Sequence, residues 1–191
     1  MKRSPVYPLI IIGAGTALFV LLGAVLRVSS PVPGVSLPIH YALLGFLSVL
    51  YGPVPGLAVG VLGRLLTDLI HGAGVWWSWI IASGVFGLLM ALAGRRFRFC
   101  RRPFGLNDAA VFILCAVVCH LICWAVLTPL LDAVLYGEPY GPMLLQGLVI
   151  AALNAFVTAV IGSLLCFLCS SFRRHRAERR RSRTVLSGRP E

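Results

Sequence analysis

The feature that most constrains this chain is a series of long apolar runs separated by short polar or basic segments. An apolar run of about 20 residues can cross the hydrocarbon core of a bilayer as a helix. Hydrophobic residues make up 59% of the 191 residues and charged residues only 12%, which is more apolar surface than a soluble domain of this length can bury. The pattern predicts an all-α integral membrane protein, a bundle of six transmembrane helices. The expected spans are Tyr7–Arg27, Leu37–Tyr51, Pro53–Ile70, Trp77–Gly94, Asp108–Leu131 and Met143–Phe172.

The basic residues predict how this bundle is oriented. The net charge is +11, and the cations gather at Lys2 and Arg3, in the segment 95–102 and in the tail from Arg173 onward. Basic segments remain on the cytoplasmic side of a membrane, and with six spans all three clusters fall on one side. We therefore expect both termini to be cytoplasmic. Residues 1–172 would form one membrane domain, and 173–191 a flexible basic tail that contacts anionic lipid rather than nucleic acid.

Three ionisable residues lie near one another in the third span. Arg64, Asp68 and His71 follow each other at helical spacings of four and three, which places them on one face. Ionisable groups inside a membrane are costly, and they usually face a cavity or each other. The pattern is typical of a binding site, with an ion pair that only stabilises the helix as the alternative. Gly56, Gly60 and Gly63 in the same span predict close packing against another helix.

Further polar and aromatic groups are expected on the outer side of the membrane. They come from the start of the second span, from the segments 71–79 and 132–142, and from the sixth span. Their convergence would allow a small solute to be captured there, although tryptophan and tyrosine are also common in ordinary interfacial belts. The residues are His40, Tyr41, Trp76, Trp77, Trp79, Asp132, Tyr136, Glu138, Tyr140, Gln146 and Asn154.

The sequence contains little that points to catalysis. There is no Gly-rich loop of the ATPase type, and the stripe formed by Cys115, Cys119 and Cys123 is better explained by packing than by a metal site. We therefore predict no enzyme activity, no metal and no covalently bound cofactor. The alternatives are a small membrane enzyme using His40, Asp68 and His71, or a stand-alone facilitator, which would need a continuous polar path.

Several stretches resemble the substrate-binding S components of energy-coupling factor (ECF) vitamin transporters, in a branch grouped with the riboflavin-type components. They are "LPIHYALLGFLSVLYGPVPGLAVGVLGRLLTDLIHGAGVWWSWIIASGVFGLL", "DAVLYGEP", the "QG" at Gln146, and Asn154. The likeness extends over about residues 9–168. The turn "YGPVPG", Asp68 and the three neighbouring tryptophans are its most specific parts.

The resemblance implies a prokaryotic plasma-membrane protein that captures a vitamin or vitamin precursor near the outer surface. It would associate with a transmembrane coupling protein and two ATPase subunits, which alone use ATP, and would release its ligand by toppling in the membrane. The family docks through small residues of the first helix, and the matching positions here are Gly13 and Ala17.

The resemblance also implies roles for the site residues. Trp76, Trp77 and Trp79 would stack on a planar ligand, and Arg64, Asp68 and His40 would hold its polar edge. The second-rank lining candidates are Asp132, Glu138, Gln146 and Asn154.

Two positions depart from the branch and bear on the ligand. His40 stands where a glutamine is expected, and Arg64 stands near the usual histidine. If both line the pocket, the ligand would carry more negative charge than those of relatives. Thiamine precursors, flavins, cobalamin and other cofactors all remain alternatives, with the branch leaning towards the pyrimidine precursor of thiamine.

Overall fold

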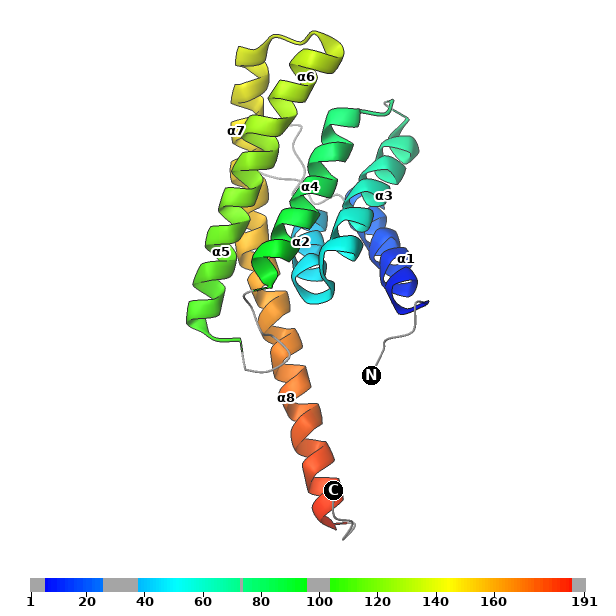
Figure 1. Cartoon of the computed structure of the whole chain (residues 1–191), viewed down its shortest axis with the longest axis vertical. Helices are drawn as coiled ribbons and strands as arrows, with labels where there is room; N and C mark the ends of the chain where they lie inside the picture. Colours follow the sequence, from blue (N-terminus) through cyan, green and yellow to red (C-terminus); the bar gives the residue numbers. More distant parts are fainter. Residues whose placement is uncertain (1–5, 26–37, 73, 96–103, 187–191) are drawn as a thin grey trace.

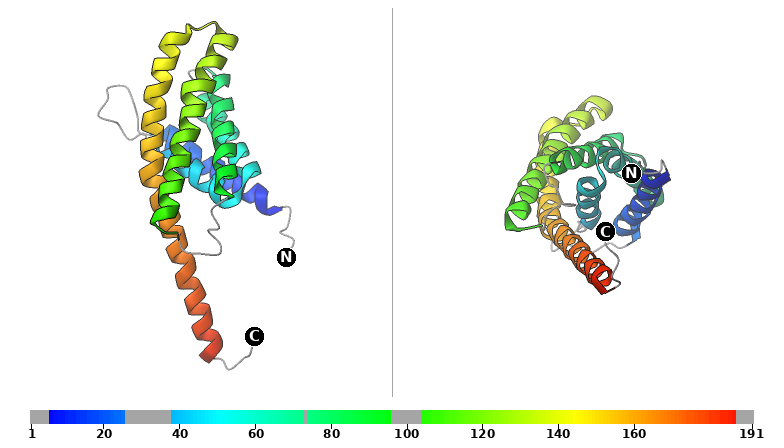
Figure 2. Two further views of the ribbon diagram at one scale, coloured as in Figure 1. Left: turned by 60° about the vertical axis from the view of Figure 1, so that its left-hand side comes forward. Right: turned by 60° about the horizontal axis from the view of Figure 1, so that its bottom comes forward.

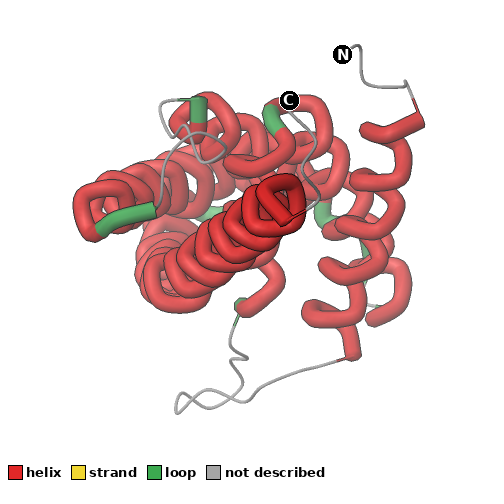
Figure 3. The backbone as a smooth tube through the Cα atoms, turned by 90° about the horizontal axis from the view of Figure 1, so that it is seen from below, coloured by secondary structure: helices red, strands yellow, loops and turns green. Residues whose placement is uncertain are grey.

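The computed structural model describes residues 6–25, 38–72, 74–95 and 104–186, and within this part of the chain every regular element is helical (Figure 3). The connection 28–36 between the first two expected spans and most of the basic segment 95–102 lie outside the described residues. The elements, including three π-helical segments marked η, are α1 (Val6–Val20), η1 (Leu21–Val25), α2 (Ile39–Tyr51), α3 (Pro53–His71), α4 (Trp77–Gly94), α5 (Leu106–His120), η2 (Leu121–Leu127), α6 (Thr128–Tyr136), α7 (Tyr140–Val157), η3 (Thr158–Gly162) and α8 (Ser163–Leu186).

The described elements join into six helical rods, and the rods that contain α5 and α7 lie along the long axis of the molecule (Figure 1). The fifth rod joins α5, η2 and α6, and the sixth joins α7, η3 and α8. Five of the described helical segments are long and apolar enough to cross a membrane, namely Val6–Ala24, Pro53–His71, Trp77–Gly94, Leu106–Tyr136 and Tyr140–Arg176. The remaining rod, α2, has 13 residues and is about 20 Å long, shorter than the roughly 30 Å of a hydrocarbon core.

The short helix α2 lies inside the bundle. It contacts α1, α3, α4, α7 and η3, and the view along the bundle shows it surrounded by the other helices (Figure 2). Tyr41, Leu44 and Ser48 on α2 are almost fully buried. Because its neighbours cover α2, a helix too short to span the bilayer can still be accommodated in it.

The glycines of α3 allow the close helix packing that the sequence predicts. A Cβ atom at Gly60 would collide with the backbone carbonyl of Ser83 on α4, and one at Gly63 would lie 2.6 Å from a ring carbon of Phe19 on α1. Gly56 likewise packs against the backbone of Gly87. Small residues therefore hold α3 against both α4 and α1.

The fifth and sixth rods are longer than predicted. The fifth continues past Leu131 to Tyr136 and ends where Gly137 adopts a φ of 69°, a left-handed cap that favours glycine. Pro129 does not end it, since the adjoining π-helical turn and the 2.8 Å bond from the Thr128 hydroxyl to the Cys123 carbonyl adjust the backbone pairing there. The connection between the two rods is consequently only 137–139, instead of the predicted 132–142.

The sixth rod passes the predicted boundary at Phe172 and continues as α8 to Leu186. Arginine is a good helix former, and Arg174 pairs with Glu178 one turn later at 3.0 Å. A basic composition is therefore compatible with a continuous helix that projects from the bundle (Figure 1).

Candidate functional site

A cavity of about 330 Å³ lies where α3, α4, α6 and α7 meet, near the short α3–α4 and α6–α7 connections. We call it the polar cavity. The cavity is lined by seven of the predicted residues: Arg64, Asp68, Trp76, Trp79, Asp132, Glu138 and Gln146. The structure therefore brings together side chains that are up to 82 positions apart in the sequence, as Arg64 and Gln146 are.

An ion pair from α3 forms one wall of the polar cavity. The Arg64 guanidinium lies 2.8 Å from the Asp68 carboxylate, with the Arg64 side chain 21% exposed and that of Asp68 7%. Asp68 also accepts a long hydrogen bond, 3.5 Å, from the backbone N–H of Trp76. The pair is one helical turn apart and lines the cavity, so this geometry is compatible both with a binding site and with an ion pair that only stabilises the helix.

Arg64 also contacts an aromatic ring of α4. Its guanidinium carbon lies 4.9 Å from the centre of the Trp79 ring, a cation–π distance. Below this ring the Ser83 hydroxyl donates to the Trp79 carbonyl at 2.8 Å and lies 2.9 Å from the Tyr41 hydroxyl. Arg64 is thus held by Asp68 on its own helix and by Trp79 on the next.

The opposite wall is organised by Asp132 on α6. Its carboxylate accepts a 2.8 Å hydrogen bond from the indole N–H of Trp76 and a second bond from the Ser78 hydroxyl. Asp132 is 3% exposed. This carboxylate joins α6 to the start of α4, where backbone N–H groups have no partner within the helix.

One more ring packs against the aromatic lining of the polar cavity. Trp76 and Tyr136 lie with their ring centres 4.7 Å apart at an angle of 40°, and the backbone N–H of Trp77 donates to the Tyr136 hydroxyl at 2.8 Å. The end of α6 therefore packs directly against the start of α4.

The three neighbouring tryptophans have different surroundings. Trp76 and Trp79 line the polar cavity, whereas Trp77 is 54% exposed and lies outside it. Residues three apart share a helix face and adjacent residues do not, so this division follows from α4 beginning at Trp77. Two of the rings therefore line the cavity, and the third has the exposure typical of an interfacial anchor.

Four other predicted residues do not line the polar cavity. His40 packs in the core against Phe19 and Tyr41, at ring-centre distances of 4.7 and 4.4 Å. Tyr41 itself is 2% exposed. The Nδ1 atom of His71 lies 2.7 Å from the Thr67 carbonyl oxygen. Because neither histidine reaches the cavity that Asp68 lines, the three residues of the enzyme alternative do not share this site.

The fourth, Asn154, is 2% exposed and lies two helical turns below Gln146 on α7. Conversely, Gly74 and Met143 line the polar cavity without having been predicted. Met143 stands three residues before Gln146 at the start of α7, and that spacing was the available signal. Ser78 was also missed, because only the fold reveals its bond to Asp132.

A second hollow, which we call the apolar groove, runs between α1 and α3. It encloses about 580 Å³, and Gly13 and Ala17 line it together with apolar residues of α3 that include Leu62, Leu66 and Ile70. A Cβ atom placed at Gly13 would meet no atom within 4 Å. The predicted docking residues therefore face open space, and α3 separates this groove from the polar cavity.

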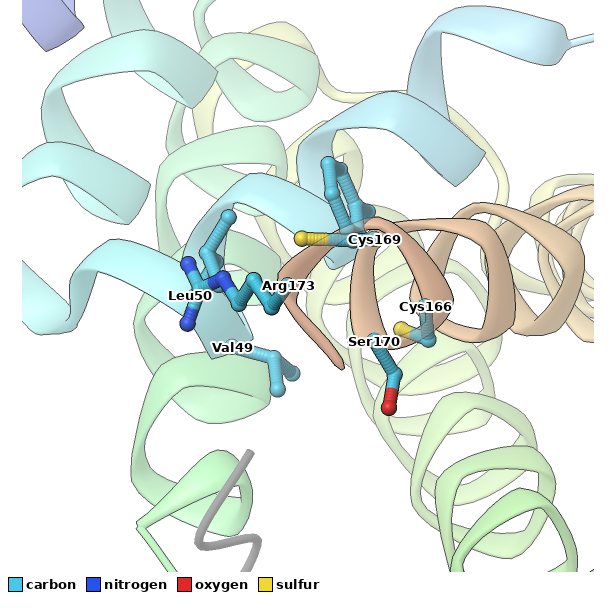
Figure 4. Close-up of a pocket in the computed structure, with 7 residues that line it drawn as sticks. Val49, Leu50, Cys166, Cys169, Ser170 and Arg173 are labelled. Atoms are coloured by element: carbon cyan, nitrogen blue, oxygen red, sulfur yellow. The ribbon is translucent and has the colours of Figure 1, made fainter. Parts of the chain in front are cut away.

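A third hollow, between α2 and α8, is too small to be a ligand site. It holds only about 10 Å³ and is bordered by Val49, Leu50, Cys166, Cys169 and Arg173 among others (Figure 4). That is room for about one water molecule. Among the described residues, no group of three or more His, Cys, Asp or Glu side chains is arranged to hold a metal ion.

Comparison with known proteins matches most of the chain to one family. The family model described as "ECF-type riboflavin transporter, S component" matches residues 4–170. A UPF0397 protein of Streptococcus pneumoniae strain Hungary19A-6 is 39% identical over 154 residues, covering 81% of this chain and 84% of the relative. The UPF0397 protein of strain CGSP14 is 38% identical over the same share of both chains.

Proposed function

Because this chain belongs to the family of ECF-type riboflavin transporter S components, we propose that it is the substrate-capture subunit of an importer of that class. Membership makes it a multi-pass membrane transport protein of a prokaryote, and the family is not a class of enzymes. The observation that carries the proposal is the polar cavity, which has two tryptophan rings and five polar side chains around about 330 Å³. This volume suits a small molecule.

The proposed ligand is a vitamin or a vitamin precursor held without covalent chemistry. Trp76 and Trp79 would contact its planar part, because aromatic rings bury a large area with little loss of conformational entropy. Arg64, Asp68, Asp132, Glu138 and Gln146 would bond its polar groups. His40, Tyr41, His71, Trp77 and Asn154 lie outside the cavity, so any part they take in binding would be indirect.

The proposed orientation places the polar cavity at the outer face and both termini in the cytoplasm. Two observations support it. The described part of α1 begins, and α8 ends, towards the same end of the molecule, away from the α6–α7 connection (Figure 1). The basic residues of α8, from Arg173 to Arg183, also lie beyond that end, on the side where positive charge is retained.

The proposed partner is a transmembrane coupling protein that docks in the apolar groove and carries two ATPase subunits. Small residues allow two helices in a membrane to approach closely, and Gly13 and Ala17 lie in the groove with nothing packed over Gly13. ATP would be used by these partners only. Substrate release would follow reorientation of the S component against the coupling protein.

The proposal is tested by isolating the protein from its native membrane under mild conditions and analysing what accompanies it. We expect a coupling protein and ATPases by proteomics, and one small molecule by mass spectrometry after denaturation. The same small molecule should be absent from a Trp76→Ala/Trp79→Ala double variant. Recovery of the pure chain without partners and without any small molecule, from cells that need the transporter, would contradict the function.

A further inference from the structure

The charges around the polar cavity are unequal. Among the described residues that line it, one is basic, Arg64, and three are acidic, Asp68, Asp132 and Glu138. Full ionisation would give the lining a formal charge of −2. An apolar surrounding strengthens the field of such charges, because it screens them less than water does.

The single positive charge is already neutralised by a neighbour. Arg64 lies 2.8 Å from Asp68 and over the ring of Trp79. A ligand carboxylate or phosphate would have to compete with Asp68 for the guanidinium, and would leave that buried carboxylate without its partner. Arg64 is therefore a poor anchor for an anion.

The negative charges of the other two carboxylates are not neutralised. Asp132 accepts hydrogen bonds from the indole of Trp76 and the hydroxyl of Ser78, which are neutral donors. Glu138 makes no ion pair with any residue that the structure describes. The net negative charge of the cavity thus resides on the wall that α6 and the α6–α7 connection form.

The aromatic lining favours the same kind of ligand. Trp76 and Tyr136 pack together beside Asp132, and the faces of such rings attract cations. A metal ion is a poor candidate, since the described residues offer no group of three or more suitable side chains.

We propose that the polar cavity selects an organic cation, a protonated amine or a positively charged heterocycle, through Asp132, Glu138 and the ring of Trp76, against which Tyr136 packs. This inference rests on the proposed capture of a small molecule and narrows its chemical class. It reverses the expectation of a more negative ligand drawn from His40 and Arg64, because His40 does not reach the cavity and Asp68 neutralises Arg64.

The test separates ligands by charge before any is identified. An ultrafiltered extract of bacterial cells is divided at pH 7 into molecules retained by a cation exchanger, molecules retained by an anion exchanger, and molecules retained by neither. Each fraction is added to the full chain in lipid nanodiscs, and the midpoint of thermal unfolding is measured. We expect the cation fraction alone to raise it. A rise with the anionic or neutral fraction alone would overturn the charge class, and no rise with any fraction would overturn the capture function too.

Variants then locate the charge, with the active compound of that fraction as the probe. Glu138→Gln should weaken its binding about fivefold and Glu138→Lys by much more. Glu178→Gln is the matched control, since Glu178 lies on α8, pairs with Arg174 and does not line the cavity. This variant should bind the probe with unchanged affinity. Equal or tighter binding by Glu138→Lys would overturn the assignment.

Discussion

The carboxylate of Asp132 on α6 accepts the indole N–H of Trp76 at 2.8 Å, joining two residues 56 positions apart at the mouth of the polar cavity. Removing the carboxylate with Asp132→Ala would leave the Trp76 and Ser78 donors without an acceptor. We expect the unfolding midpoint to fall by about 5 °C, the effect of roughly 2 kcal/mol. Glu178→Ala removes an exposed carboxylate and should change it little. Equal midpoints for Asp132→Ala and the unmodified chain would show that this bond does not stabilise the fold.

The Arg64–Asp68 ion pair predicts that a single and a double variant will differ in stability. Arg64→Ala leaves a buried carboxylate uncompensated and should destabilise the chain by about 2 kcal/mol, whereas Arg64→Ala/Asp68→Asn leaves no charge behind and should recover most of that loss. Thermal or denaturant unfolding in nanodiscs measures both. If the two substitutions were simply additive, the pair would not act as a unit.

The different surroundings of the three tryptophans predict how a phenylalanine at each position affects ligand binding. Trp76→Phe and Trp79→Phe should each weaken binding of the co-purified small molecule about fivefold, because each ring lines the cavity. Trp77→Phe should bind normally, since that ring is outside it. Isothermal titration gives the affinities.

Brominated lipids provide an independent check on the same tryptophans, because they quench indole fluorescence on contact. Trp77 is 54% exposed, so brominated lipids should quench its fluorescence more strongly than that of the other tryptophans. The Trp77→Phe variant should therefore be quenched less than the unmodified chain. Stronger quenching of Trp79 than of Trp77 would mean that the cavity and lipid faces of α4 have been assigned in reverse.

The apolar groove can be filled without disturbing the fold. Gly13→Leu adds a side chain where a Cβ atom meets nothing within 4 Å, so the unfolding midpoint and small-molecule affinity should stay as they are. Association with the coupling protein should fall at least about tenfold, because close helix approach is lost. Co-purification with tagged coupling protein measures it.

The control for the groove is a bulky substitution on another exposed helix face. Leu114 on α5 is 63% exposed and lies outside the groove, so Leu114→Phe should leave the association intact. A stable complex with Gly13→Leu would remove the groove from the docking surface.

Local spacing was sufficient to predict most helices and one wall of the site. Trp77–Gly94 has the predicted bounds, and Arg64 and Asp68 pair across one helical turn as their spacing allows. These features depend on neighbours within one helix. The cap at Gly137 and the helical continuation past Arg173 were missed, because the expected lengths followed the thickness of a bilayer rather than the backbone signals.

What spacing could not provide was the rotation of each helix and its depth in the bundle. His40 and Asn154 look like site residues in the sequence, yet His40 packs against Phe19 and Asn154 is buried away from the cavity. Trp77 and Trp79 are two residues apart, and only the helix phase decides which faces the cavity. Asp132 bonds to Trp76 and Ser78 because α6 packs against α4. These helices are far apart in the sequence, so no local pattern predicts the contact.

The position of α3 has one more consequence. Its Arg64 and Asp68 face the polar cavity, while Leu62, Leu66 and Ile70 of the same helix face the apolar groove. Any shift of this shared wall that an occupant of one hollow induces is transmitted to the other. Thermodynamic linkage makes this effect reciprocal. If a bound ligand changes the affinity for a partner in the groove by some factor, the bound partner changes the affinity for the ligand by the same factor. A single helix would thereby let loading of the cavity and engagement of the groove regulate each other.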